Sequence, residues 1–131
     1  MASIRKEIST KAPPSEVWAA IRDVGALHTR LVPGFVTDTR LEDGGRVVTF
    51  GNGMQVLERI VDLDDDARRL VWSAAAANLT HHNASVQVFA ENGGSRIVWI
   101  ADLLPDEMKD PIEGLIDQGL SVMKTTLDKL G

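Results

Sequence analysis

His82 is the first residue whose type suggests chemistry, because an unperturbed imidazole titrates near neutrality and can hold a ligand or move a proton. It lies in Thr80–Ala90, where apolar side chains occupy every second position. The shared apolar face consists of Ala84, Val86, Val88 and Ala90. Strand alternation places His82 on this core face and His81 on the opposite one, so the two rings cannot chelate one metal ion. Three roles stay open for His82: a wall histidine, a ligand contact, and a general acid or base.

Arg46 and Glu58 form the second candidate, and their relation depends on the register of a hairpin at Gly51–Gly53. A three-residue loop places Arg46 opposite Glu58, on the face that also gathers Phe50, Val48, Met54, Val56 and Ile60. A two-residue Asn52–Gly53 turn would instead place Val47 opposite Glu58. We favour the first register because it brings the larger apolar residues together. A buried guanidinium and carboxylate must be paired, so Arg46 and Glu58 would either stabilise the fold or bind a polar group of a ligand. In a register that turns them toward solvent they would do neither.

The elements that must position these residues follow from periodicity and turn chemistry. The predicted strands are Ser3–Thr10, Phe35–Leu41, Arg46–Phe50, Met54–Leu63, Arg68–Ala74, Thr80–Ala90 and Ser95–Leu103. The predicted helices are Ser15–Asp23, a short one at Ala26–Val32, and a long C-terminal one. The six later strands are joined by short turns such as Glu42–Gly45 and Glu91–Gly94, which is typical of an antiparallel meander. The fold class is therefore α+β.

The C-terminal helix is expected to begin at Pro111, with Asp110 as its N-cap. Its apolar stripe is Ile112, Leu115, Ile116, Gly119, Met123, Leu127 and Leu130. A sheet that curls around this stripe buries it economically. Gly114 and Gly119 each cost about 1 kcal/mol of helix propensity relative to Ala. Close approach of sheet backbone or space for a ligand beneath the helix would explain them, and we favour the space for a ligand.

Composition limits the function. The chain has 131 residues, which suits one domain over residues 1–131, and a net charge of −5, which disfavours a nucleic-acid partner. It contains no cysteine and so has no disulfide or thiolate metal site. No signal peptide, membrane-spanning segment or nucleotide-binding loop is evident, so we expect a cytoplasmic protein without membrane insertion, metal or cofactor.

Several segments together resemble the SRPBCC, or START-like, helix-grip superfamily, and in particular its bacterial polyketide cyclase/dehydrase-like members. The resemblance is carried by Ala12–Trp18 at the first helix, by Arg46–Arg59 around Gly53, and by Arg68–Ser73 and Ser95–Trp99 on later strands. It covers the whole chain. One difference is Arg30–Gly34, where many relatives have a Trp-x-Pro sequence.

The resemblance implies a helix-grip fold: a curved seven-stranded antiparallel sheet around the long C-terminal helix, two short helices after the first strand, and an internal cavity. It also implies that Glu58 and His82 correspond to pocket positions of plant abscisic-acid receptors, and that the Gly51–Gly53 hairpin lies where those receptors carry a mobile gate. By strand alternation Leu70, Trp72 and Ala74 would line the cavity, with Ile97, Trp99 and Ala101 from a neighbouring strand.

The expected function is binding of a small, largely apolar ligand that is lipid-, polyketide- or aromatic-like. The expected ligand-binding residues are Arg46, Val48, Val56, Glu58, Trp72, His82, Val86, Trp99, Leu115, Ile116, Gly119 and Met123. An alternative is a cyclase/dehydrase-type enzyme in which His82 or Glu58 abstracts a proton and Arg46 stabilises an enolate. A second alternative is a protein-interaction module with a filled core. The protein would be a monomer or a homodimer.

Overall fold

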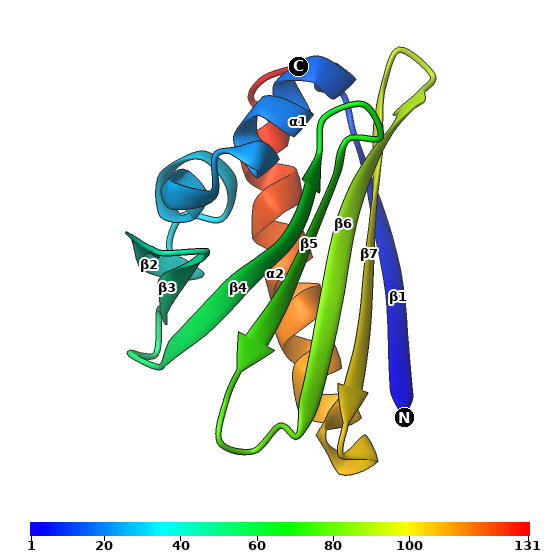
Figure 1. The fold of residues 1–131 in the computed structure, drawn as a ribbon. Helices are drawn as coiled ribbons and strands as arrows, with labels where there is room; N and C mark the ends of the chain where they lie inside the picture. The colour runs from blue at the N-terminus through cyan, green and yellow to red at the C-terminus, as the bar shows by residue number, and fades with distance from the viewer.

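The computed structural model describes all residues, 1–131, and contains one seven-stranded antiparallel sheet. The strands are β1 (Ala2–Thr10), β2 (Val36–Glu42), β3 (Gly45–Phe50), β4 (Gln55–Asp64), β5 (Arg69–Ala75), β6 (His81–Glu91) and β7 (Gly94–Leu104). Their order across the sheet is β1-β7-β6-β5-β4-β3-β2, so β2 to β7 form an uninterrupted meander and β1 closes the far edge. Figure 1 shows this sheet curving around the long helix α2. The structure therefore confirms the predicted helix-grip fold.

Helix α2 (Lys109–Asp128) carries the predicted apolar stripe except for Leu130, which lies beyond the end of the helix and is exposed. The buried residues of the helix are Ile116, Gly119, Leu120, Met123 and Leu127. The predicted N-cap was wrong. The chain enters the helix through a 3₁₀ turn, η3 (Asp106–Met108), so that Met108 precedes the first helical residue and Asp110 lies inside the helix. Proline is tolerated in a first helical turn, and Pro111 at the third position therefore does not mark the start.

The segment after β1 contains α1 (Pro14–Arg22), a 3₁₀ turn η1 (Val24–Ala26) and a π-helical turn η2 (Leu27–Leu31). The second short helix was thus predicted in the right place, but it is a single wide turn. Helix α1 is held at Trp18, whose Nε1 donates to Asp65 Oδ1 at 2.8 Å, and at Arg22, whose Nε lies 2.8 Å from the same oxygen. The acidic turn between β4 and β5 therefore holds α1 in place.

One end of the interior is solid. We call it the packed end, and it consists of Ala12, Val88, Ser95, Ile97 and Leu127, all buried. Its polar groups bond to each other: Ser95 Oγ donates to the Ala12 carbonyl at 2.7 Å, and Thr10 Oγ1 donates to Asp128 Oδ1 at 2.6 Å. These bonds tie β1, β7 and the end of α2 together, so no polar group there needs a further partner.

Candidate functional site

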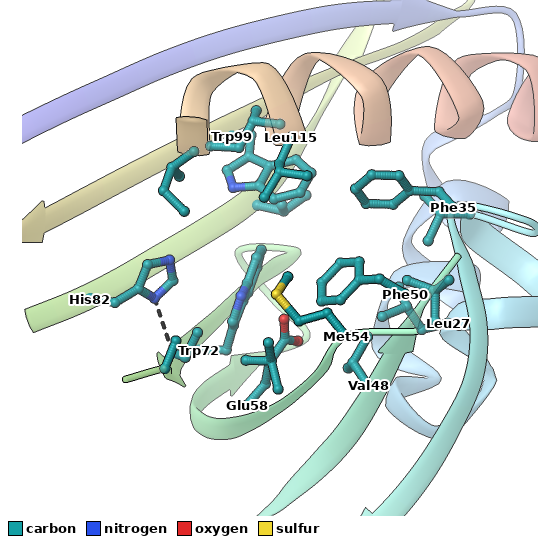
Figure 2. Close-up of a pocket in the computed structure, with 18 of the residues that line it drawn as sticks. Leu27, Phe35, Val48, Phe50, Met54, Glu58, Trp72, His82, Trp99 and Leu115 are labelled. Atoms are coloured by element: carbon teal, nitrogen blue, oxygen red, sulfur yellow. Dashed lines mark hydrogen bonds between the residues drawn. The ribbon is translucent and has the colours of Figure 1, made fainter. Parts of the chain in front are cut away.

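The other end of the interior is hollow. A cavity of about 260 Å³ lies between the sheet and the first half of α2, and 22 of its 27 lining residues are hydrophobic. Figure 2 shows its walls, which come from β3 to β7 on one side and from Leu115 of α2 on the other. An apolar cavity of this size, with few polar groups, is the usual form of a small-molecule site.

Two tryptophans form part of the sheet wall of this cavity. Trp72 of β5 and Trp99 of β7 both line it, and their rings meet edge to face with centroids 5.6 Å apart. This contact fixes the position of both rings at the cavity wall.

All the predicted ligand-binding residues except Gly119 line this cavity. They are Arg46, Val48, Val56, Glu58, Trp72, His82, Val86, Trp99, Leu115, Ile116 and Met123. Leu70 and Ala74 line it too, whereas Ile97 and Ala101, expected on its wall, are buried in the sheet core outside it.

Gly119 does not border the cavity. A Cβ atom there would lie 3.1 Å from the ring of Phe35, so the glycine accommodates that ring and provides no space for a ligand. Both explanations considered for this glycine, close approach of sheet backbone and space for a ligand, are therefore wrong, because the neighbour is the Phe35 side chain. Gly114, by contrast, has no neighbour within 4 Å of such a Cβ.

The hairpin register that pairs Arg46 with Glu58 is confirmed. The loop closes with Phe50 N donating to Met54 O at 2.8 Å, and Gly53 takes the positive φ of 89° that this turn requires.

Arg46 and Glu58 form a buried ion pair. Arg46 Nε donates to Glu58 Oε1 at 2.9 Å, and the two residues are only 3% and 8% exposed. Arg46 also donates to the Val24 carbonyl at 3.2 Å. The charges thus compensate each other at the cavity wall, and the second Glu58 oxygen has no partner within the chain.

His82 faces the cavity and His81 is exposed, as the alternation predicted. The backbone N–H of Ala74 donates to Nδ1 of His82 at 2.9 Å, and the Ser73 hydroxyl donates to the His82 carbonyl at 2.6 Å. These two bonds replace the regular ladder, because the pairing of β5 with β6 ends at Trp72 and Ala84. Burial, and secondarily the neighbouring His81, lower the pKa of His82 below its usual value. The ring is therefore neutral at pH 7, with its proton on Nε2.

This bond also decides what His82 can do chemically. The lone pair that a general base would use on Nδ1 is already accepting the Ala74 N–H. The remaining nitrogen, Nε2, carries the proton and makes no hydrogen bond within the chain. The neutral ring is consequently a hydrogen-bond donor toward the cavity, and one oxygen of Glu58 is already engaged by Arg46.

Some lining residues were missed from the sequence. They include Leu27, Leu31, Phe35, Phe50, Leu79, Met108 and Ile112. Most lie on turns and loops, where no periodicity indicates which way a side chain points. Phe50 was placed on the right face of its hairpin but not counted as a ligand contact; its ring meets Phe35 edge to face at 5.5 Å.

The cavity reaches the surface between the β3–β4 turn, the β5–β6 loop and the start of α2. Its lining there includes Met54, which is 43% exposed, together with Asn78 and Pro111, also exposed. Asn78 Nδ2 contacts the Met108 sulfur at 3.7 Å and so connects the β5–β6 loop to the chain just before α2. In Figure 1 this loop and the start of α2 lie at the same end of the sheet.

No group of three or more His, Asp or Glu side chains comes together in the structure. Neither helix has the combination of length and apolar character that crossing a membrane requires.

The architecture defines a helix-grip protein, and solved structures share it. XoxI from Bacillus cereus is 20% identical with a TM-score of 0.86, and the match covers 97% of this chain and 96% of XoxI. A protein from Thermobifida fusca is 27% identical over 99% of this chain and 95% of its own, with a TM-score of 0.81. The di-domain ARO/CYC BexL from the BE-7585A biosynthetic pathway is 14% identical with a TM-score of 0.83; 98% of this chain matches 47% of that one.

The amino-acid sequence identifies the family to which the chain belongs. The model of the polyketide cyclase / dehydrase and lipid transport family matches residues 1–130, so the chain belongs to this family. No curated protein matches the chain.

Proposed function

We propose that the protein binds a small, largely apolar molecule in the cavity between β3–β7 and α2. The observation that carries this proposal is the cavity itself, which is apolar on most sides and has Arg46, Glu58 and His82 on its wall. The family description, with its lipid transport and polyketide chemistry, and the resemblance to BexL support the same use of the fold.

The volume of the cavity favours a compact ligand. An apolar cavity of about 150 Å³ accommodates benzene, and the present 260 Å³ leaves room for a second ring. It lies just below the range of about 300–1,000 Å³ typical of drug-sized ligands. An aromatic or short polyketide-like molecule therefore fits better than a long acyl chain.

Binding is favoured over the two alternatives. A filled core, on which the interaction-module hypothesis depended, is contradicted by the cavity. Proton abstraction by His82 or Glu58 is disfavoured because the Ala74 N–H occupies one nitrogen of His82 and the Arg46 guanidinium occupies one oxygen of Glu58. The same groups suit hydrogen bonding to a bound molecule.

The test uses naphthalene as a probe and thermal unfolding as the measurement. Ligand that binds only the folded state stabilises it by about 2.7 kcal/mol at a hundredfold excess over Kd, so Tm should rise by several degrees. Leu115→Trp fills the cavity from α2 and should abolish the rise. Gln118→Trp adds the same ring at an exposed position of α2 and should retain it. An unchanged Tm in the unmodified protein, or an equal rise in both variants, would contradict the proposal.

A further inference from the structure

Three polar groups of residues that line the cavity have hydrogen-bonding capacity that the chain does not use. They are His82 Nε2, the Trp99 indole Nε1 and the second oxygen of Glu58. Trp99 Nε1 is the one buried side-chain nitrogen or oxygen in the structure that has no hydrogen-bond partner. Leaving a buried donor unpaired is unfavourable, and native proteins seldom do so without a functional reason.

His82 and Trp99 lie on the same face of two neighbouring strands. His82 is on β6 and Trp99 on β7, whose register pairs Val86 with Trp99 and Leu103 with His82, so the two residues are offset by four positions along the strands. In Figure 2 the free ring nitrogen of His82 is turned toward the space bordered by Trp72, Trp99 and Leu115, and the indole nitrogen of Trp99 lies on the side of its ring that faces His82 and Trp72. Both residues line the cavity.

Both nitrogens are donors, and this is fixed by geometry. The indole nitrogen can only donate. For His82, the bond from Ala74 N to Nδ1 at 2.9 Å requires Nδ1 to accept, which leaves the proton on Nε2. A ligand group beside them must therefore be an acceptor.

The acceptor must also be uncharged. The one cation on the cavity wall, Arg46, is already paired with Glu58 at 2.9 Å. A ligand carboxylate or phosphate would be desolvated without a free countercharge and would be repelled by Glu58.

From these observations, and resting on the proposed binding function, we infer that the ligand carries an uncharged oxygen acceptor, of the ketone, ester, lactone or amide type. His82 Nε2–H and Trp99 Nε1–H are its hydrogen-bond donors. The rest of the ligand is a compact apolar frame.

The experiment compares 1-tetralone with tetralin, which have the same two-ring frame with and without a carbonyl. Their Kd values are measured by calorimetry in the unmodified protein and in His82→Leu, Trp99→Phe and His81→Leu. The ratio of the two Kd values isolates the contribution of the carbonyl group to binding, because changes in cavity shape affect both probes. We expect each cavity variant to shift the ratio against 1-tetralone by about fivefold to tenfold. The exposed His81 variant should leave the ratio unchanged.

NMR gives an independent measurement on the unmodified protein. The chain has three tryptophans and therefore three indole N–H signals. 1-Tetralone, but not tetralin, should move the Trp99 signal downfield. The Trp18 signal, already bonded to Asp65 at 2.8 Å, should not move and serves as the internal reference. Histidine ¹⁵N spectra should show His82 as the Nε2–H tautomer.

The outcomes separate this inference from the proposed function. If both probes bind but the ratio is the same in the unmodified protein, His82→Leu and Trp99→Phe, the acceptor inference is wrong and the binding function stands. Tighter binding of 1-naphthoate than of 1-tetralone, or an Nδ1–H tautomer of His82, would also overturn the inference. If neither tetralin nor 1-tetralone binds, the proposed function itself fails.

Discussion

The two ends of the interior differ in how their polar groups are satisfied. At the packed end, Ser95 and Thr10 bond to groups of the same chain at 2.7 and 2.6 Å. At the cavity end, Trp99 Nε1 has no partner, and His82 is bonded on one nitrogen only. Both ends lie under the same sheet and the same helix. At one end the polar groups are paired within the chain, whereas at the other end polar groups of cavity-lining residues are left without a partner.

Helix α2 shows the same division along its length. Leu127, at the packed end, is fully buried, whereas Leu115 and Ile112, at the cavity end, are only partly covered. The same apolar stripe of α2 therefore packs against the sheet at one end and borders the cavity at the other. Four predictions test this contrast.

The largest effect is expected from Glu58→Ala, which leaves the buried Arg46 guanidinium without its partner at 2.9 Å. Loss of one member of a buried pair typically costs about 3–5 kcal/mol. Urea denaturation measures the loss. The double variant Arg46→Met/Glu58→Leu removes both charges and should recover most of it. A loss below about 1 kcal/mol for Glu58→Ala would mean that the pair is effectively solvated.

The second-largest effect comes from making the same Leu→Ala substitution at the two ends of α2. Leu127→Ala opens a void in a solid region and should cost about 2–5 kcal/mol. Leu115→Ala enlarges an existing cavity from a partly covered position and should cost less than half as much. Chemical denaturation of the two variants is the measurement. Equal costs would contradict the division into a packed and a hollow end.

A smaller contrast is expected at the two helix glycines. Gly114→Ala meets no atom within 4 Å and should stabilise the protein by about 0.5–1 kcal/mol. Gly119→Ala places a methyl group 3.1 Å from the Phe35 ring and should displace that ring toward the cavity. We expect it to gain less stability and to weaken naphthalene binding. Thermal unfolding with and without naphthalene measures both effects, and identical behaviour of the two variants would show that Phe35 does not depend on Gly119.

The smallest effect concerns pH. Burial lowers the pKa of His82 below its usual 6.5. As the pH falls, His82 is therefore protonated in the unfolded chain at a higher pH than in the folded protein. The free energy of unfolding should therefore decrease from about pH 6.5 down to the folded-state pKa and be flat above pH 7 for this group. His82→Asn keeps a side-chain oxygen for the Ala74 N–H but does not titrate, so its stability should depend less on pH. His81→Asn is the matched control, and the prediction is wrong if both variants lose the same pH dependence.

Much of the fold could be predicted because the signals were local. Alternation placed His82 inside and His81 outside, and the gathering of large apolar residues selected the register that pairs Arg46 with Glu58. Both depend on neighbours in sequence or directly across a hairpin, where period and turn length determine the geometry.

What could not be predicted depends on contacts between distant segments. Nothing near Gly119 indicates that Phe35 will pack against it, and nothing near Asp65 indicates its bond to Trp18. The start of α2 was misplaced because the sequence at Asp110 has a cap-like composition, while the preceding 3₁₀ turn already begins the helical path.

The measurement that tests the central claim most directly is a set of intermolecular NOEs between naphthalene and the protein's methyl groups. We expect contacts to Val48, Val86 and Leu115 at the cavity end, and none to Val88, Ile97 or Leu127 at the packed end. Contacts at the packed end, or no contacts at saturating naphthalene, would contradict it.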